Sequence, residues 1–120
     1  MARTILIVDD NRATRDALRA VLTMKGYAVA EASGGREALE YLRAGGEASA
    51  IVLDLAMPAM SGHEVHEELQ RDPMLANIPV VVFSALDDDG RMHGIVAYIR
   101  KAVDPDVLLQ ALEKACGPTP

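Results

Sequence analysis

The sequence has little aromatic content and almost no cysteine. It contains three tyrosines, one phenylalanine and no tryptophan, which are too few and too scattered to form a surface for stacking nucleic-acid bases. Cys116 is the single cysteine, which excludes an internal disulfide and a cysteine-ligated zinc site. We expect a reducing compartment, an aliphatic core, and Cys116 as a small buried hydrophobe.

The chain also lacks long apolar runs and an excess of positive charge. Nearly apolar runs such as residues 78–85 are far shorter than the roughly 20 residues of a membrane helix, and the N-terminus has no signal-peptide pattern. Twelve basic against eighteen acidic residues give a net charge of −6, which argues against direct binding of nucleic acid or an anionic membrane. We therefore expect a soluble cytoplasmic protein.

Short apolar runs rich in β-branched residues alternate with longer segments of helical periodicity. The runs cover residues 4–8, 28–32, 50–53, 80–83 and 95–99. Three of them are apolar on both faces, as in the central strands of a parallel sheet. The alternation predicts an α/β fold, with a doubly wound five-stranded parallel sheet in the order 2-1-3-4-5 and helices on both faces.

Capping residues and apolar stripes mark the expected helices. Ser61 and Glu64 match a capping box, and Asp104 before Pro105 suits a helix N-terminus. Asp72 before a proline should end the third helix, and Gly117 should end the last one. The apolar stripe predicted for the last helix consists of Val107, Leu108, Ala111, Leu112 and Ala115.

Polar residues follow four of the five apolar runs. Asp9 and Asp10 follow the first run, Asp54 the third, Ser84 the fourth, and Lys101 lies just after the fifth. Because the carboxyl ends of parallel strands meet at one edge of a sheet, we expect these groups to converge. Three carboxylates repel one another unless a cation offsets them. Oxygen ligands suit Mg²⁺, and we expect Asp10 and Asp54 to bind it directly.

These groups suffice for phosphoryl transfer. Beside Mg²⁺, an Asp carboxylate can attack phosphorus and form an acyl phosphate, while Lys101 and the Ser84 hydroxyl contact other phosphoryl oxygens. Three carboxylates, one ammonium and Mg²⁺ sum to zero charge, so an arriving phosphoryl group adds roughly −1 to −1.5 net charge. A local change of that size can operate a switch.

Together with their neighbours, these residues resemble the response regulator receiver domains of bacterial two-component signalling. The resemblance rests on residues 5–10, 54–62, 82–85 and 98–101, and it spans nearly the whole chain. It implies a flavodoxin-like receiver fold over residues 1–117, similar to a chemotaxis-type single-domain receiver. Residues 118–120 would be a C-terminal tail or the start of a linker.

The resemblance assigns roles to the carboxylates. It implies that Asp54 is the phosphoacceptor and that Mg²⁺ is the cofactor. Asp10 would bind the metal directly, together with the backbone carbonyl of Ala56. Asp9 would lie in the metal's outer sphere.

The resemblance also implies a switch and its partners. Ser84 and Lys101 would sense the phosphoryl group, and the ring of Tyr98 would report on the state of Ser84. The phosphoryl donor would be a histidine kinase or a histidine phosphotransfer protein, and the output a changed affinity for a protein target. Such a chain is a signalling phosphoprotein that catalyses only its own phosphorylation and dephosphorylation, not an enzyme.

The sequence departs from the family between Ser84 and Lys101. Ala102 follows Lys101 where most receivers have a proline with a cis bond. Because cis costs a non-proline residue about 2.5–4 kcal/mol, we predict a trans bond. The segment is also short by about one helical turn. Residues 86–94 contain three consecutive Asp and two Gly, so we predict a loop or a single turn in place of the fourth helix.

Two residues beside the site bear on the lifetime of an acyl phosphate. Ala56 lies two residues after Asp54, and Leu86 lies two after Ser84. Neither side chain can orient an attacking water through a hydrogen bond. We therefore predict slow decay of the phosphoryl group in the absence of a partner phosphatase.

Three alternatives remain open at this point. In the first alternative, the chain is a pseudo-receiver that binds partners without switching. In the second, it is the regulatory domain of a longer DNA-binding or enzymatic regulator. A hydrolase with an Asp nucleophile is the least favoured, because no second Asp lies two residues after Asp54 and no cap domain exists.

Other polar residues are expected to be solvated. His63 and His66 share one helix face, and no third metal ligand is evident near them in the sequence. The first helix carries a row of arginines beside the acidic residues, for which a solvated face is favoured over a surface that complements an acidic kinase. These are Arg12, Arg15 and Arg19.

Overall fold

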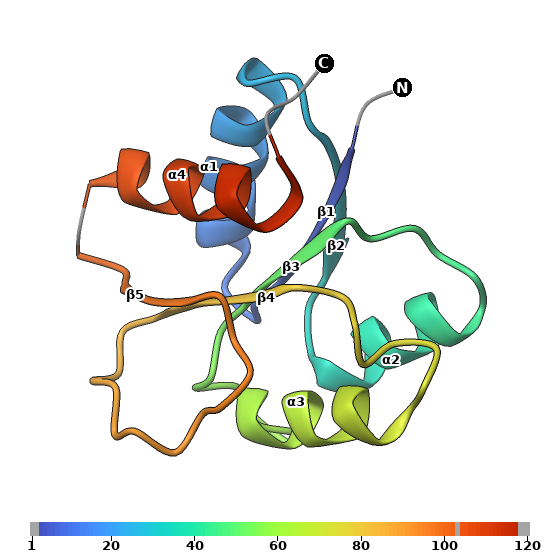
Figure 1. Ribbon diagram of the computed structural model, residues 1–120. Helices are drawn as coiled ribbons and strands as arrows, with labels where there is room; N and C mark the ends of the chain where they lie inside the picture. The colour runs from blue at the N-terminus through green and yellow to red at the C-terminus, as the bar shows by residue number, and fades with distance from the viewer. Residues whose placement is uncertain (1–2, 103, 118–120) are drawn as a thin grey trace.

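A computed structural model describes residues 3–102 and 104–117, and the predicted tail at residues 118–120 lies outside them. In these residues the chain forms five strands and four helices (Figure 1). The strands are β1 (Thr4–Val8), β2 (Ala28–Ala32), β3 (Ala50–Leu53), β4 (Val80–Ser84) and β5 (Ala97–Arg100). The helices are α1 (Arg12–Met24), α2 (Gly35–Arg43), α3 (Gly62–Arg71) and α4 (Pro105–Cys116).

The strands form one parallel sheet in the order β2-β1-β3-β4-β5, as predicted. The three central strands are the three apolar runs, and nearly all of their residues are buried. Helices α2 and α3 cover one face, and α1 and α4 cover the other (Figure 1). The doubly wound architecture therefore follows from the alternation of strands and helices along the sequence.

Two aliphatic clusters fill the space between the sheet and its helices. Along β1, Leu6 and Val8 belong to the cluster under α2 and α3, whereas Ile5 and Ile7 belong to the cluster under α1 and α4. This division reflects the alternation of side chains along a strand. Tyr27 is the one aromatic residue among the buried members of the two clusters, and Tyr41, Phe83 and Tyr98 pack against them from partly buried positions.

The helix ends agree with the capping residues in the sequence. Ser61 and Glu64 form the predicted capping box at the start of α3. Asp104 caps α4, with Pro105 at its first turn. Helix α3 ends before Asp72, and α4 ends before Gly117, whose φ of 78° favours glycine.

The boundaries of two strands differ from the prediction. β4 extends to Ser84, which lies opposite Arg100. β5 begins at Ala97 rather than at residue 95. Ala97 pairs with Val81, which is the second residue of β4, so β4 offers only one more residue for pairing before Ala97. Residue 95 would lie opposite Pro79, before β4 begins.

The segment between β4 and β5 contains no helix within residues 85–96, which confirms the prediction for the fourth helix. In place of a helix, Met92, Ile95 and the ring of Tyr98 pack against the cluster under α3. The described residues contain no cis peptide bond, so the bond between Lys101 and Ala102 is trans, as predicted.

Three side-chain environments differ from the expected ones. His66 is buried at 8% exposure, so the histidine pair is not simply solvated. Burial, and then the neighbouring His63, lower the pKa of His66. In α4, Leu109 is buried while Val107 is 43% exposed, which rotates the buried stripe from the predicted one. Cys116 is half-buried at the edge of the cluster under α1 and α4, and burial raises its pKa.

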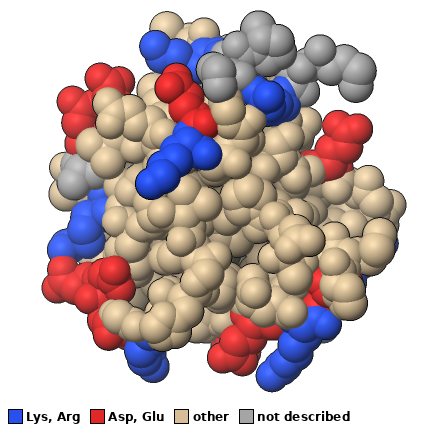
Figure 2. Space-filling view, viewed as in Figure 1, with Lys and Arg blue, Asp and Glu red and all other residues tan. Residues whose placement is uncertain are grey.

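Charged side chains of both signs surround the face that Figure 2 shows. Acidic and basic side chains of the described residues are interspersed around a largely uncharged centre there. None of the described helices is long and apolar enough to span a bilayer.

Gly62 lets α3 pack closely against the end of β3. Its amide donates to the Leu55 carbonyl at 3.0 Å. A Cβ at this position would fall inside 3.0 Å of the Asp54 carbonyl oxygen and the Leu55 Cα, closer than real Cβ atoms approach. Because both obstacles are backbone atoms, rotating a side chain cannot relieve the clash.

We predict that Gly62→Ala lowers the free energy of unfolding by about 1–3 kcal/mol. Gly34→Ala is the matched control, because a Cβ at Gly34 meets no atom within 4 Å. Its effect should stay near 0.5 kcal/mol, the scale of a helix cap. Urea denaturation of both variants measures the difference, and equal losses would contradict the role assigned to Gly62.

Candidate functional site

The carboxyl edge of the sheet brings together the five polar residues predicted to converge. Carboxylate oxygens of Asp9, Asp10 and Asp54 all lie within 4.8 Å of one another. The Lys101 ammonium lies 2.8 Å from Asp9 Oδ2 and 3.5 Å from Asp54 Oδ2. Ser84 ends β4 at the same edge, and its hydroxyl interacts with the Asp54 carboxylate.

Asp54 directly follows β3 and is buried, like Asp9 after β1. It is 4% exposed, and its own amide donates to the Val8 carbonyl at 2.9 Å. The Ala56 amide donates to Asp54 Oδ1 at 3.3 Å. The carboxylate is therefore anchored by the sheet behind it and by the loop that leads into α3.

Lys101 reaches the carboxylates without the family proline. Its amide donates to the Ser84 carbonyl at 2.9 Å, directly after the last pair of the β4–β5 ladder. The ladder thus fixes where the side chain starts, and the two carboxylates attract its ammonium. The shorter distance is to Asp9, so Asp9 holds the lysine more closely than Asp54 does.

The electrostatics of the site disfavour a negative charge on Asp54. Burial raises the pKa of Asp54, and the nearby charge of Asp9 raises it further. Lys101, the Ala56 amide and the Ser84 hydroxyl act in the opposite direction without cancelling the rise. For Lys101, burial is the largest single influence and lowers the pKa, but Asp9 and Asp54 together raise it, so the ammonium stays charged.

The donor set fits a hard divalent cation. Three carboxylates that bring oxygens within 4.8 Å of one another are the ligands that Mg²⁺ prefers, and Lys101 supplies only one positive charge against them. Asp10 is exposed while Asp9 and Asp54 are buried, so a cation has access from the side of Asp10. The cluster therefore offers the oxygen donors that a hard divalent cation requires.

Ser84 and Tyr98 meet at one residue, Leu86. The Leu86 amide donates to Ser84 Oγ at 3.2 Å. The Tyr98 hydroxyl donates to the Leu86 carbonyl at 2.9 Å. The two residues expected to form a switch are thus linked through the backbone at the start of the helix-free segment.

The sequence analysis missed the groups that hold Asp9. The Asn11 amide donates to Asp9 Oδ1 at 2.8 Å, and Arg15 donates to the Asp9 carbonyl at 2.8 Å. The prediction of a solvated arginine face was therefore wrong for Arg15, whose side chain is only 15% exposed. A charged residue in the otherwise apolar β2, Glu31, was the available signal, because it needs a cationic partner from α1.

We predict that Asp54→Asn stabilises the metal-free protein at neutral pH. The raised pKa means that the folded chain binds a proton at Asp54 more readily than the unfolded chain does. The ionised carboxylate therefore opposes folding above the folded-state pKa, and this penalty disappears as the pH falls below the unfolded value of about 3.9. Asparagine should raise the stability at pH 7 by about 1 kcal/mol, or roughly 4 °C in Tm.

Thermal unfolding in chelator, from pH 7 down to pH 4, measures this effect. Asp16→Asn is the control, because Asp16 is exposed and lies 3.9 Å from Arg12 in a solvent-exposed ion pair. The gain for Asp54→Asn should shrink toward acid pH, and the control should show little change. A gain that does not depend on pH would contradict the electrostatic explanation.

Comparison with known proteins gives a consistent result. The family model described as response regulator receiver domain matches residues 5–113. The chain is 42% identical over 83 residues to response regulator MprA of Mycolicibacterium vanbaalenii, covering 69% of this chain and 35% of that protein. It is 39% identical over 116 residues to response regulator PleD of Caulobacter vibrioides, covering 92% of this chain and 25% of that protein. The chain thus spans only about a quarter to a third of the length of these curated relatives.

Solved structures agree with the fold. A response regulator receiver protein from Pseudomonas putida superimposes with a TM-score of 0.87 at 29% identity, covering 95% of this chain and 98% of that one. Response regulator TrrA of Thermotoga maritima, solved in complex with Mg²⁺-BeF, gives a TM-score of 0.86 at 28% identity, covering 94% and 98%. The site geometry, the family model and these structures agree: the chain belongs to the response regulator receiver domain family of two-component systems.

Proposed function

We propose that the chain accepts a phosphoryl group on Asp54 in the presence of Mg²⁺, and that this modification changes its affinity for a protein partner. The observation that carries the proposal is the cluster of three carboxylates within 4.8 Å, with the Lys101 ammonium beside it. The donor would be a histidine kinase or a histidine phosphotransfer protein in the cytoplasm. Direct binding to nucleic acid or membrane is not part of the proposal, given the net charge of −6.

Asp10 and Asp54 would hold the metal directly, together with the Ala56 carbonyl, and Asp9 would lie in its outer sphere. The relative TrrA supports this proposal, because that protein was solved with Mg²⁺ and BeF. When bound, Mg²⁺ offsets the negative charge of the carboxylates and of the incoming phosphoryl group. This charge compensation counters the repulsion that raises the pKa of Asp54.

The chemistry is an in-line displacement at phosphorus. An Asp54 carboxylate oxygen attacks the phosphorus of a phosphohistidine, a P–O bond forms, and the P–N bond breaks with its electron pair left on the imidazole nitrogen. Lys101 stays charged in the site and would move from Asp9 to the phosphoryl oxygens. The chain would turn over no metabolite, so this is a signalling role.

Leu86 supplies a route from the site to the surface. If the Ser84 hydroxyl turns to the phosphoryl group, the Leu86 amide loses its acceptor. The Leu86 carbonyl, which accepts from Tyr98, belongs to the same residue, so the tyrosine contact changes with it. Leu86 is 46% exposed, and a partner can therefore detect this rearrangement.

The same domain also fits a larger regulator. Some curated relatives are longer than this chain. PhoB of Pseudomonas aeruginosa is 31% identical over 126 residues, and the match covers 98% of this chain but 55% of that protein. We propose that the phosphorylation chemistry resides in residues 1–117 whether or not an effector domain follows. A pseudo-receiver remains the competing proposal, and the next experiment separates the two.

We predict that acetyl phosphate with Mg²⁺ adds one phosphoryl group to the intact protein, as measured by mass spectrometry. Asp54→Asn and a chelator should each abolish the gain, because one removes the nucleophile and the other removes the charge compensation. Asp16→Asn should behave as wild type, since this exposed carboxylate lies outside the site. A gain that persists in Asp54→Asn would refute the assignment of the phosphoacceptor.

We also predict that the phosphoryl group, once formed, lasts for many minutes or longer after the donor is removed. Ala56 offers no side-chain hydrogen bond to orient water, whereas Ala56→Asn would introduce one and should shorten the lifetime. The decay of the phosphorylated mass with time gives both lifetimes. A wild-type lifetime of seconds would count against the prediction.

A further inference from the structure

The backbone carbonyl of Asp9 lies just beyond the paired part of β1. The Asp9 amide still donates to the Ala32 carbonyl at 3.1 Å, which continues the ladder to β2 by one bond. Its carbonyl instead accepts from Arg15 Nη1 at 2.8 Å. The Asp9 carbonyl, which lies beyond the paired strands, is therefore hydrogen-bonded by a side chain from the first turn of α1.

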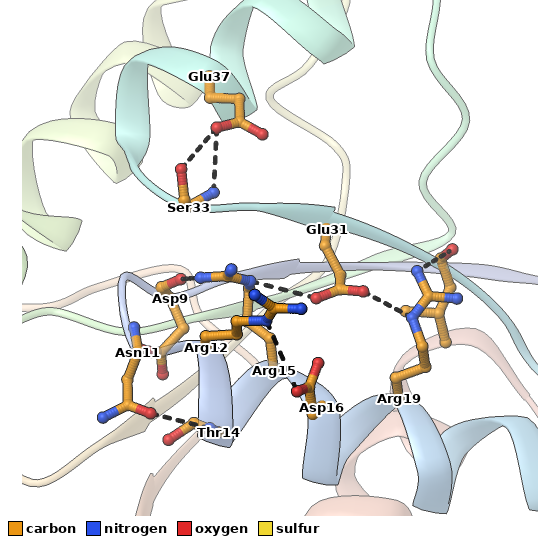
Figure 3. Close-up of polar contacts among 11 residues, drawn as sticks. Asp9, Asn11, Arg12, Thr14, Arg15, Asp16, Arg19, Glu31, Ser33 and Glu37 are labelled. Carbon is orange, nitrogen blue, oxygen red and sulfur yellow. Dashed lines mark hydrogen bonds and ion pairs between the residues drawn. The ribbon is translucent and has the colours of Figure 1, made fainter.

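Arg15 is itself held in place by a second residue. Its Nε lies 3.1 Å from Glu31 Oε1, and Arg19 Nε lies 2.6 Å from Glu31 Oε2, so one carboxylate sits between two guanidinium groups (Figure 3). Hydrogen bonding to Arg19 is the main reason that the pKa of Glu31 is lowered. At 15% exposure, Arg15 has little freedom to leave this position.

The Asp9 carbonyl belongs to the same rigid peptide group as the Asp10 amide. Holding that carbonyl therefore fixes the plane from which the Asp10 side chain departs. Asp10 needs this support, because its exposed carboxylate has no hydrogen bond or ion pair among the described residues. The carboxylate of Asp9, by contrast, already contacts the Asn11 amide and Lys101.

We propose that Arg15 is a positioning residue for the metal site: its hydrogen bond to the Asp9 carbonyl orients Asp10 toward Asp54. This inference rests on the proposed function, because it concerns the same carboxylates. Glu31 contributes by fixing Arg15, and Arg19 contributes by fixing Glu31. Supporting residues of this kind typically change metal affinity by 10–100-fold when they are removed.

The test compares Arg15→Met with Arg43→Met. Arg43 is a matched control, because it also contacts two carboxylates, Glu68 at 3.3 Å and Asp72 at 3.9 Å, but lies on α2 across the sheet from α1. Isothermal titration with MgCl₂ gives the dissociation constant for Mg²⁺ without any phosphoryl donor. Acetyl phosphate at varied Mg²⁺ then gives the concentration for half-maximal phosphorylation.

We expect Arg15→Met to weaken Mg²⁺ binding by about tenfold and to raise the half-maximal Mg²⁺ concentration by a similar factor. Saturating Mg²⁺ should restore phosphorylation, because Asp54 itself is intact. Arg43→Met should match wild type in both measurements, although thermal unfolding will register its lost ion pairs. Arg15→Lys should be intermediate, since one ammonium replaces the fork that reaches both Asp9 and Glu31.

Mg²⁺ affinity in Arg15→Met equal to wild type would overturn the inference, as would an equal loss in Arg43→Met. Should Arg15→Met not fold, Glu31→Gln keeps the arginine but loosens its anchor, and it must weaken Mg²⁺ binding by a smaller factor. A wild-type chain that binds Mg²⁺ but takes up no phosphoryl group overturns the proposed function alone, and the MgCl₂ titration still tests Arg15. A wild-type chain that binds no Mg²⁺ overturns both.

Discussion

The mutual repulsion of three carboxylates at one edge of the sheet is the constraint on which the rest of the structure depends. Asp54 is buried beside Asp9, and both effects raise its pKa. The fold tolerates this arrangement because one ammonium, that of Lys101, and two backbone amides, those of Asn11 and Ala56, contact the carboxylate oxygens. Each of these groups follows a different strand, so residues from three strand ends together offset the negative charge of the carboxylates.

Much of the fold and the membership of the site followed from the sequence. Alternating runs located the strands, and polar residues at their carboxyl ends identified Asp9, Asp10, Asp54, Ser84 and Lys101. The parallel topology makes this inference possible, because it brings the residues after each strand to one edge. The repulsion among three carboxylates, together with their oxygen donors, then pointed to a divalent cation.

Other features depended on three-dimensional detail that no local pattern carries. His66 is buried and lines a hollow together with Arg91 and Met92 of the helix-free segment, a placement that the sequence of α3 alone does not indicate. In α4, Leu109 is buried where the sequence predicted Val107. The difference corresponds to a rotation of the helix by a fraction of a turn, and the spacing of apolar residues does not determine the orientation of a helix that finely. The contact of Arg15 with Asp9 needed the spacing between α1 and the sheet, although Glu31 in β2 hinted at a buried cation.

The absence of a helix between β4 and β5 would change the free energy with which any partner binds this segment. Several amides of this segment bond to nearby side chains, such as Gly90 to Asp88 and Arg91 to Asp89, rather than to a continuous backbone ladder. A partner that binds this segment must restrict the segment's backbone. The conformational entropy lost in doing so reduces the affinity gained per unit of contact area. We therefore expect a complex formed through this segment to be weaker than one of equal contact area formed through a preformed helix.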